Sequence, residues 1–174
     1  MDNDRIEKDR IEKEMHELEH KIQFTFNDIQ LLAKAMKSCK INNLDAGKNH
    51  KEYCNESLAT VGDSILHFVI TDEIYKKYSN ITKGKLTTLA DSLENNATLY
   101  EVDQKEEIIK YAYNDKHFNK DPNIPGHEKV VHKKHDPYIE AIVGAIYYDQ
   151  GYEKVKSWIN TYLYPLLEKY KKQE

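Results

Sequence analysis

Two apolar stretches of the chain carry acidic residues at helical spacing. The first stretch, residues 55–63, reads Asn-Glu-Ser-Leu-Ala-Thr-Val-Gly-Asp. Its acids Glu56 and Asp63 lie close to two helical turns apart, so both side chains fall on one edge of a helix. Position 59, one turn before Asp63, holds alanine. This edge therefore carries two carboxylates with an uncharged position between them.

The second stretch, residues 140–151, reads Glu-Ala-Ile-Val-Gly-Ala-Ile-Tyr-Tyr-Asp-Gln-Gly. Each stretch has a glycine on its packing side, Gly62 in the first and Gly144 in the second. Glycine has no side chain, so another helix can approach closely at such a position. If the two glycine surfaces cross, Asp63 and Glu140 are expected to meet near the crossing.

Carboxylates that are held together repel one another unless they are protonated or bound to a metal ion. Mg²⁺ relieves the repulsion because it accepts oxygen ligands and keeps several waters, and Mn²⁺ is expected to substitute for it. A bound cation also activates water and neutralises phosphate charge, as phosphodiester hydrolysis requires. We expect Asp63, Glu140 and Asp136, which stands one turn before Glu140, to hold the ion. The plainer alternative is a solvated helix face whose glycines serve only packing, and spacing alone leaves it open.

Helical periodicity dominates the rest of the chain. Apolar residues recur every three or four positions between residues 55 and 78, which predicts a long helix. Asp136-Pro137 predicts a helix start, with aspartate as the N-cap and proline in the first position, and Gly151 predicts its end. Further helices are expected from residue 86 to about 99, around 106–113, and from 152 to about 172. Strand patterns are nearly absent, so the fold is predicted to be all-α.

The N-terminal segment, residues 1–21, is strongly charged and carries a narrow apolar stripe that includes Ile11, Met15 and Leu18. We divide the chain into this leader helix and one domain over residues 22–174, because a length of 174 residues suits a single core. The leader either packs on the domain or on a partner chain, or it remains a solvated extension. The sequence leaves these alternatives open.

The net charge of the chain is −4, so bulk positive charge does not draw it to nucleic acid. Such binding needs metal ions or a local basic patch, and the candidate residues are Lys83, Lys85, Lys129, Lys133 and Lys134. No apolar run reaches the ~18 residues that span a membrane, and the charged N-terminus is not a secretory signal. The two cysteines are expected to be reduced thiols. These features predict a cytoplasmic protein that has no membrane partner.

At the residues described above, the chain resembles the ribonuclease III family. The family signature Asn-Glu-x-Leu-Glu-x-Leu-Gly-Asp is similar to residues 55–63, and the segment Glu-Ala-Ile-x-Gly-Ala-Ile-Tyr-x-Asp-x-Gly is similar to residues 140–151. Residues 24–35 look like the opening helix of the family, and residues 83–87 look like its Glu-Gly-x-Leu-Ser/Thr turn. The order and spacing agree with the family over most of the chain.

This resemblance implies an all-helical endonuclease domain that works as a homodimer. It implies Mg²⁺-dependent cleavage of double-stranded RNA to products with short 3′ overhangs. By position, Asp63 and Glu140 correspond to metal-binding acids of the family, and Glu56 corresponds to an acid at the edge of the same valley. The lysines would hold the RNA backbone, since A-form duplexes are recognised by shape, phosphates and 2′-hydroxyls.

Several positions depart from the family pattern. The second glutamate of the signature, normally a metal ligand, is Ala59. The family aspartate three residues before the matched glutamate is replaced by Pro137, with Asp136 one position away, and the glutamate of the turn is replaced by Lys83. Because position 59 belongs to the catalytic set, we expect cleavage to be impaired in this chain. Ala59 fits either a natural pseudoenzyme or a deliberate replacement of glutamate.

Two other functions stay open at this stage. A protein that keeps the fold without catalysis would be an inactive double-stranded-RNA-binding or scaffold protein. His132, His135 and Asp136 also bring to mind the HD phosphohydrolases, a helical class with a histidine-aspartate pair. That class needs further histidine and aspartate ligands on successive helices, and the sequence offers no convincing set.

Overall fold

The computed structural model describes residues 2–38, 54–113 and 137–171, with side chains from residue 8 onward. The elements within these ranges are α1 (Asp2–Ile22), α2 (Ile29–Met36), α3 (Glu56–Lys77), α4 (Lys83–Glu94), α5 (Asn96–Lys105), η2 (Ile108–Tyr111), α6 (Tyr138–Gln150), α7 (Tyr152–Trp158), η3 (Ile159–Leu163) and α8 (Tyr164–Tyr170). No strand occurs in these ranges, where the only β pairing is an isolated bridge between Lys37 and Tyr113. The prediction of an all-α fold is confirmed.

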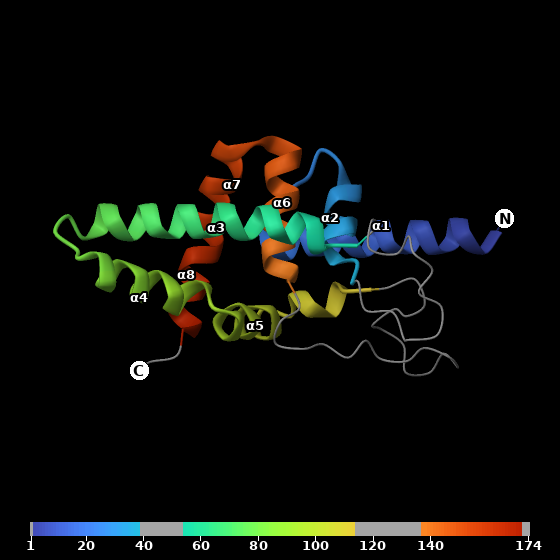
Figure 1. Cartoon of the computed structure of the whole chain (residues 1–174). Helices are drawn as coiled ribbons and strands as arrows, with labels where there is room; N and C mark the ends of the chain where they lie inside the picture. The colour runs from blue at the N-terminus through green and yellow to red at the C-terminus, as the bar shows by residue number, and fades with distance from the viewer. Residues whose placement is uncertain (1, 39–53, 114–136, 172–174) are drawn as a thin grey trace.

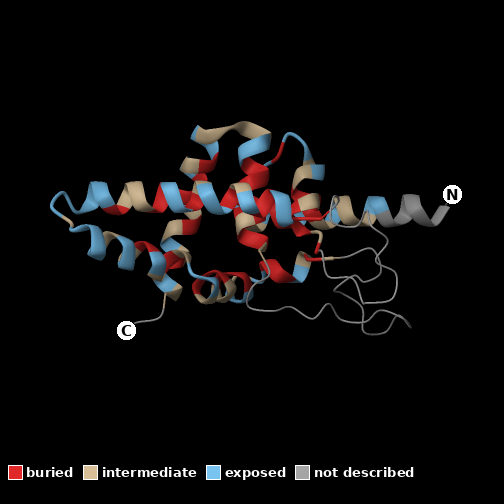
Figure 2. Cartoon of the chain, in the orientation of Figure 1, coloured by how far each residue is buried: buried red, intermediate tan, exposed pale blue. Residues whose placement is uncertain are grey.

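The centre of the molecule is the crossing of α3 and α6. In Figure 1, α3 runs along the length of the view and α6 passes across it. Residues 141–146 of α6 are all buried, so this helix is apolar on nearly every side and forms the middle of the core (Figure 2). Helix α3 packs more extensively on α6 than on any other element. The two acidic stretches that are distant in sequence thus lie against each other.

The C-terminal half of α1 belongs to this core. Met15, Leu18 and Ile22 are fully buried. The Ile22 carbonyl accepts a hydrogen bond from Nε1 of Trp158 at 2.8 Å, which ties α1 to α7. The N-terminal half of the helix extends past the other described elements (Figure 1). The sequence left open whether this segment packs or remains a solvated extension, and its second half packs on the domain. The boundary between a leader helix at residues 1–21 and a domain from residue 22 stays a prediction.

The predicted helix from residue 86 to about 99 is wrong, because two helices occupy that stretch. Helix α4 ends at Glu94, and α5 begins directly after Asn95. The Asn95 side chain accepts hydrogen bonds from the backbone N–H groups of Ala97 and Thr98 at 3.1 and 3.0 Å, so it caps the new helix. The helix expected around residues 106–113 is also wrong, since η2 is a short 3₁₀ turn that follows Glu107 at a φ of 57°.

The start of α6 differs from its prediction, and its end agrees. The helix begins at Tyr138, and Pro137 takes the N-cap position with no side-chain hydrogen bond. The prediction that Pro137 takes the first helical position is therefore wrong. Asp136, the predicted N-cap, lies outside the described residues. Gly151 ends α6 at a φ of 82°, a left-handed conformation that suits glycine, as predicted. The final predicted helix is continuous from α7 through the π-helical turn η3 to Tyr170.

Two further expectations meet the structure here. Cys54 is buried and disulfide-bonded, so the expectation of two reduced thiols is wrong, while Cys39, the other cysteine of the chain, lies outside the described residues. Across the part of the chain that the structure describes, every helix is too short or too polar to cross a membrane.

Candidate active site

The α3–α6 crossing brings the two helix backbones into direct contact. A Cβ atom built on Gly62 would lie 1.7 Å from the carbonyl oxygen of Glu140, and one built on Gly144 would lie 2.2 Å from the carbonyl oxygen of Leu58. Real Cβ atoms never approach other atoms so closely, so neither position accepts a side chain without separating the helices. The prediction that the two glycine surfaces cross is confirmed.

Asp63 and Glu140 lie beside this contact, and the charge of Asp63 acts on Glu140. Asp63 follows Gly62 and is exposed, whereas Glu140 is half-buried against α3. Burial, with the negative charge of Asp63 adding to it, raises the pKa of the Glu140 carboxyl to about 7. Desolvation and a like charge both favour the protonated acid, and a bound cation would reverse that preference. Near neutral pH the Glu140 carboxyl can therefore either keep its proton or release it to bind a metal ion.

The remaining predicted acids are placed less centrally. Glu56 is exposed in the first turn of α3. Ala59 is 6% exposed and belongs to the buried core, so its position offers no oxygen to the site. Asp136 lies outside the described residues. Of the predicted acids, the structure brings together only Asp63 and Glu140.

Asp103 on α5 is an acid near the site that the sequence reasoning missed. It is 2% exposed, and its Oδ1 has no hydrogen-bond partner within the described residues. Burial raises its pKa well above the usual range, and the charge of Glu140 adds to the effect. Asp103 falls between the two wrongly placed helices of the prediction. Had α5 been predicted with its correct bounds, the position of Asp103 beside Val102 on the apolar side of the helix would have indicated a buried acid.

A histidine–glutamate pair adjoins Asp63 on the side of α4. His67 stands one turn after Asp63, and its Nδ1 lies 2.5 Å from Oε1 of Glu94. The hydrogen bond to Glu94 raises the pKa of His67, and the charges of Asp63 and Asp91 add to this. Burial raises the pKa of the Glu94 carboxyl, although the histidine opposes it. A spacing of four residues between Asp63 and His67 could have indicated this neighbour from the sequence.

The donor set can be compared with the needs of a divalent cation. Within residues 2–38, 54–113 and 137–171, no three histidine, cysteine or acidic side chains gather in a way that could hold a metal ion. Mg²⁺ in enzymes is usually held by one or two carboxylates, with waters and substrate phosphates completing its shell. A half-buried carboxyl with a pKa of about 7 beside a second acid fits such a partial shell. The chemistry suits the ion, and a full protein cage is not preformed.

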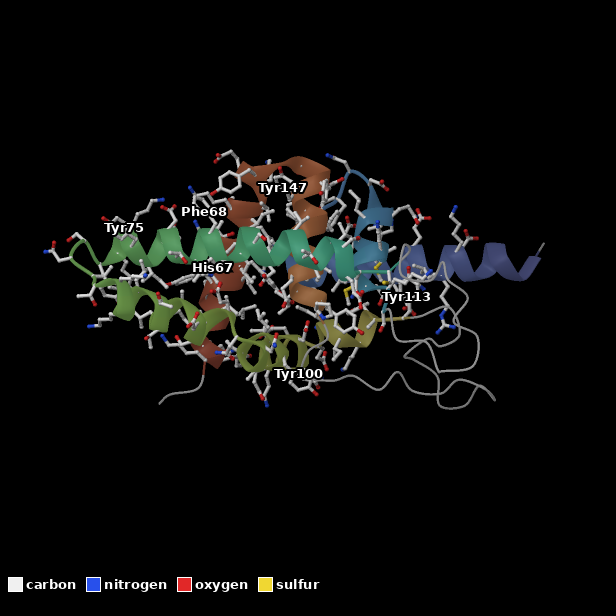
Figure 3. All side chains as sticks on the ribbon, in the orientation of Figure 1. His67, Phe68, Tyr75, Tyr100, Tyr113 and Tyr147 are labelled. Atoms are coloured by element: carbon white, nitrogen blue, oxygen red, sulfur yellow. The ribbon has the colours of Figure 1, made fainter. Side chains whose placement is uncertain are left out.

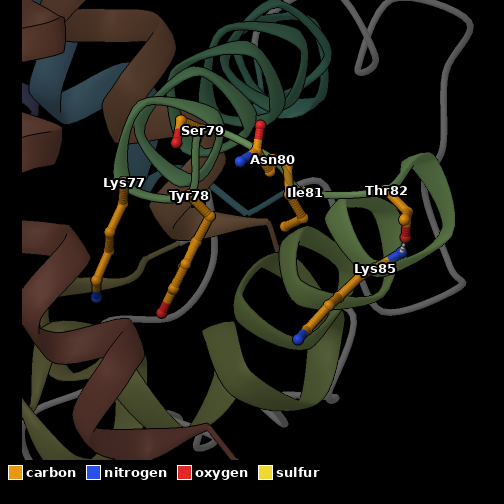
Figure 4. Close-up of a pocket in the computed structure, with 7 residues that line it drawn as sticks. All are labelled: Lys77, Tyr78, Ser79, Asn80, Ile81, Thr82 and Lys85. Carbon is orange, nitrogen blue, oxygen red and sulfur yellow. Dashed lines mark hydrogen bonds between the residues drawn. The ribbon is translucent and has the colours of Figure 1, made fainter.

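A hollow with basic edges lies where α3 turns into α4. Its volume is about 470 Å³, and it is lined by Lys77, Tyr78, Ser79, Asn80, Ile81, Thr82 and Lys85. Figure 4 shows the side chains of Lys77, Tyr78 and Lys85 extending toward the same side of this turn. Lys83 is exposed at the first position of α4. The other predicted RNA contacts, Lys129, Lys133 and Lys134, lie outside the described residues.

Aromatic side chains gather on the opposite side of α3. Phe68 on α3 and Tyr148 on α6 are each 58% exposed. The Phe68 ring lies 6.2 Å from that of Tyr152, and the rings of Tyr147 and Tyr148 are 5.4 Å apart. Figure 3 places Phe68 and Tyr147 on one side of α3 and His67 on the other. Large exposed aromatic groups of this kind are typical of interaction surfaces.

Comparison with known proteins identifies the family of the chain. A family model described as Ribonuclease-III-like matches residues 42–167, which is most of the chain. The chain belongs to this family. The chain is 31% identical over 163 residues to Ribonuclease 3 of Caenorhabditis elegans, covering 91% of this chain and 14% of that protein. It is 31% identical over 157 residues to Ribonuclease 3 of Desulfotalea psychrophila, covering 89% of this chain and 61% of that protein.

Solved structures agree on the fold. The nuclease domain of ribonuclease III from Campylobacter jejuni superposes with a TM-score of 0.66 at 21% identity, covering 88% of this chain and 95% of that one. Giardia Dicer superposes with a TM-score of 0.60 at 18% identity, covering 90% of this chain and 20% of that one. The chain spans less than two thirds of the length of the two ribonucleases named above. The activities of those whole proteins are therefore only proposed for this chain.

Proposed function

We propose that the chain is a ribonuclease III-type endoribonuclease that cleaves double-stranded RNA with Mg²⁺ and leaves short 3′ overhangs. The observation that carries the proposal is the backbone contact of Gly62 and Gly144, which sets Asp63 beside Glu140 in a family of nucleases. The short 3′ overhangs and the choice of double-stranded RNA as substrate follow from the family resemblance alone.

In this proposal Asp63 and Glu140 hold the cation, and Asp136 is a further candidate ligand. A bound Mg²⁺, or Mn²⁺ in its place, supplies an activated water and neutralises charge on the phosphate. The Glu140 carboxyl must release its proton to bind the ion, and its pKa of about 7 makes that release easy at neutral pH. Glu56, exposed one turn before position 59, would act at the edge of the site.

In this proposal, the alanine at position 59 lowers the rate of RNA cleavage. A glutamate at position 59 would bring a third carboxylate one turn before Asp63, whereas alanine contributes none. Ligands of one metal site act as a unit, so the loss of one strongly reduces turnover. We therefore propose impaired cleavage in this chain.

The RNA would be held by lysines at the α3–α4 turn. Lys83 and Lys85 lie at the start of α4, and Lys77 and Lys85 line the hollow. Lys129, Lys133 and Lys134 are proposed to add to this surface. A-form RNA offers phosphates and 2′-hydroxyls across its minor groove, so these contacts would carry little base specificity.

We propose that two copies of the chain form a homodimer, which would combine two acidic sites along one duplex. The exposed rings of Phe68, Tyr147 and Tyr148 support an interaction surface on one side of α3. The Campylobacter jejuni structure concerns a region involved in dimer formation of its nuclease domain. A cytoplasmic location stays part of the proposal, and the bonded Cys54 is an observation against it because disulfides are rare in cytosolic proteins.

The test is cleavage of a long end-labelled RNA duplex by the chain with Mg²⁺, Mn²⁺ or EDTA. We expect slow, metal-dependent cleavage that Asp63→Asn abolishes. Glu73→Gln is the matched control, because Glu73 lies on the same helix away from the crossing and should leave the rate unchanged. Metal-independent cleavage, or full activity in Asp63→Asn, would refute the nuclease proposal.

An inactive double-stranded-RNA-binding or scaffold protein is the second candidate function. Two observations favour it: Ala59 offers no ligand, and the described residues contain no preformed group of three metal ligands. Duplex RNA binding without cleavage, in this chain and after Ala59→Glu, would select the scaffold function over the enzyme.

A further inference from the structure

His67 and Glu94 form a hydrogen-bonded pair that joins α3 to α4. Nδ1 of His67 lies 2.5 Å from Oε1 of Glu94. The two side chains differ in exposure, at 60% for the histidine and 14% for the glutamate. The carboxylate is therefore the inner end of the pair, and the imidazole ring is its outer end. Because Glu94 occupies Nδ1, the other ring nitrogen, Nε2, remains for a ligand from outside.

The position of His67 on α3 places this ring next to Asp63. The two residues are four positions apart, and side chains at that spacing are neighbours on a helix surface, with Cβ atoms about 5–6 Å apart. Both residues are exposed. Figure 3 shows His67 on the opposite side of α3 from Phe68 and Tyr147. The ring thus lies beside the candidate site and away from the aromatic surface.

The surroundings of His67 favour its charged form. The hydrogen bond to Glu94 raises the pKa of His67 above 6.5, and the charges of Asp63 and Asp91 add to this, while burial acts in the opposite direction. These acids face the ring from its own helix and from α4. An imidazolium donates from both ring nitrogens, one toward Glu94 and one outward. A phosphate oxygen is a suitable acceptor for the outward donor, because both partners are charged.

We propose that His67, oriented by Glu94, binds a phosphate of the RNA backbone next to the phosphate that is cleaved. This inference rests on the proposed ribonuclease function. The acids of the site repel the RNA backbone, and a cation one helical turn from Asp63 offsets that repulsion where it is strongest. Lys77, which lines the hollow, lies 14 residues after Asp63, or about 21 Å along the helix. His67 therefore supplies positive charge at the acids, and the lysines supply it farther along the duplex.

The competing explanation is a structural pair that holds α4 on α3 and never touches RNA. The experiment measures duplex RNA binding by the full chain from pH 6 to pH 9, by fluorescence anisotropy in EDTA at several salt concentrations. At pH 6, His67→Gln should weaken binding a few-fold and reduce the slope of log affinity against log salt by about 1. At pH 9 the parent chain and His67→Gln should bind alike, because a neutral imidazole neutralises no phosphate.

His67→Lys tests the charge directly. Lysine stays protonated throughout this range, so the variant should bind RNA like the parent chain at pH 6 and more tightly than the parent chain at pH 9. Glu140 also titrates in this range, and it is present in every variant. The differences between the proteins at one pH therefore report position 67. A structural pair would leave these differences at zero.

His16→Gln is the matched control. Nδ1 of His16 lies 2.7 Å from Oε2 of Glu19, with side chains 55% and 9% exposed, so α1 carries a second pair of the same kind. Helix α1 packs mainly on α2 and η2. His16→Gln should therefore keep the pH profile of the parent chain. An equal loss of binding in His16→Gln and His67→Gln would overturn the assignment, because it would reflect only the net charge of the chain.

Glu94→Gln tests the positioning role of the glutamate. It removes the negative charge that raises the pKa of His67, so the loss of RNA binding should begin at a lower pH than in the parent chain. Thermal unfolding without RNA reports the structural role separately, and a pair with an exposed partner should contribute little to it. Variants that unfold earlier but keep the RNA-binding profile of the parent chain would overturn the proposal. If His67→Gln does not fold, the comparison with His67→Lys decides.

The same measurements tell a failure of this inference from a failure of the proposed function. If the parent chain binds no duplex RNA, in EDTA or with Ca²⁺, the proposed function fails and the role of His67 fails with it. If the parent chain binds RNA and His67→Gln has the same affinity and salt slope at every pH, only the role of His67 is lost.

Discussion

The α3–α6 crossing and the α3–α4 turn hold their charged groups in opposite ways. At the crossing, carbonyl oxygens press on Gly62 and Gly144, so the backbones themselves set where Asp63 and Glu140 stand. At the turn, Lys77 and Lys85 line an open hollow at the end of long flexible side chains. Close packing fixes position within a fraction of an ångström, whereas exposed lysines keep their freedom and act through their summed charge. Substitutions should therefore have large effects at the crossing and small, additive effects at the turn.

The largest expected effect comes from a single methyl group at the crossing. Gly62→Ala or Gly144→Ala places a Cβ about 2 Å from a backbone carbonyl of the facing helix, which neither backbone can accommodate. We expect a loss of roughly 4 kcal/mol or more in the free energy of unfolding, or failure to fold. Urea denaturation followed by circular dichroism measures it.

Gly84→Ala is the matched control at the turn. Its Cβ would meet nothing within 4 Å, and it lies in the first turn of α4. Alanine favours helix over glycine by up to ~1 kcal/mol, so this variant should be as stable as the parent chain or slightly more stable. Similar destabilisation by all three substitutions would contradict the contrast between the two regions.

The second expected effect concerns catalysis at the crossing. Ala59→Glu should raise Mg²⁺-dependent cleavage of duplex RNA by roughly tenfold or more, because it restores an acid one turn before Asp63. Ala59→Gln is the control, since it has nearly the same shape but no charge. Single-turnover rates measured across a range of Mg²⁺ concentrations test this, and equal rates in both variants would argue against a vacant ligand position.

The third expected effect is a dependence of stability on pH in EDTA. The Glu140 pKa is raised from 4.5 to about 7 on folding, so the folded state binds the proton more tightly than the unfolded state. Stability from this group is full below pH 4.5 and is lost as the pH rises to about 7. The loss is about 3 kcal/mol at most.

Thermal unfolding of the parent chain and of Glu140→Gln at several pH values isolates this contribution. The parent chain should lose stability relative to the variant as the pH rises from 5 to 8, and Mg²⁺ should restore it at pH 8. Asp103 titrates in the same direction and its pKa is raised by the charge of Glu140, so the difference reports Glu140 together with its effect on Asp103. Parallel curves would show that Glu140 ionises freely in the folded protein.

The smallest expected effect lies at the turn. Each of Lys77→Ala, Lys83→Ala and Lys85→Ala should weaken duplex RNA binding only a few-fold. Each should also reduce the slope of log affinity against log salt by about 1 if the lysine contacts a phosphate. Lys105→Ala, at the end of α5, is the control. Fluorescence anisotropy with an RNA duplex in EDTA measures the slope, and an unchanged slope would assign these lysines to solvation.

The tertiary structure supplied the crossing of the two glycine stretches, which the sequence left as a condition. The sequence by itself determined the all-α class and marked Gly62 and Gly144 as positions where another helix can approach closely. These follow from local periodicity and from the absence of side chains at Gly62 and Gly144, which are properties of each stretch alone. The break between α4 and α5 at Asn95 was not predicted, because the apolar periodicity continues past this residue. The structure shows that the Asn95 side chain caps a new helix there. Only the tertiary structure placed Asp103 beside Glu140, because burial and the approach of α5 to α6 depend on contacts between distant segments.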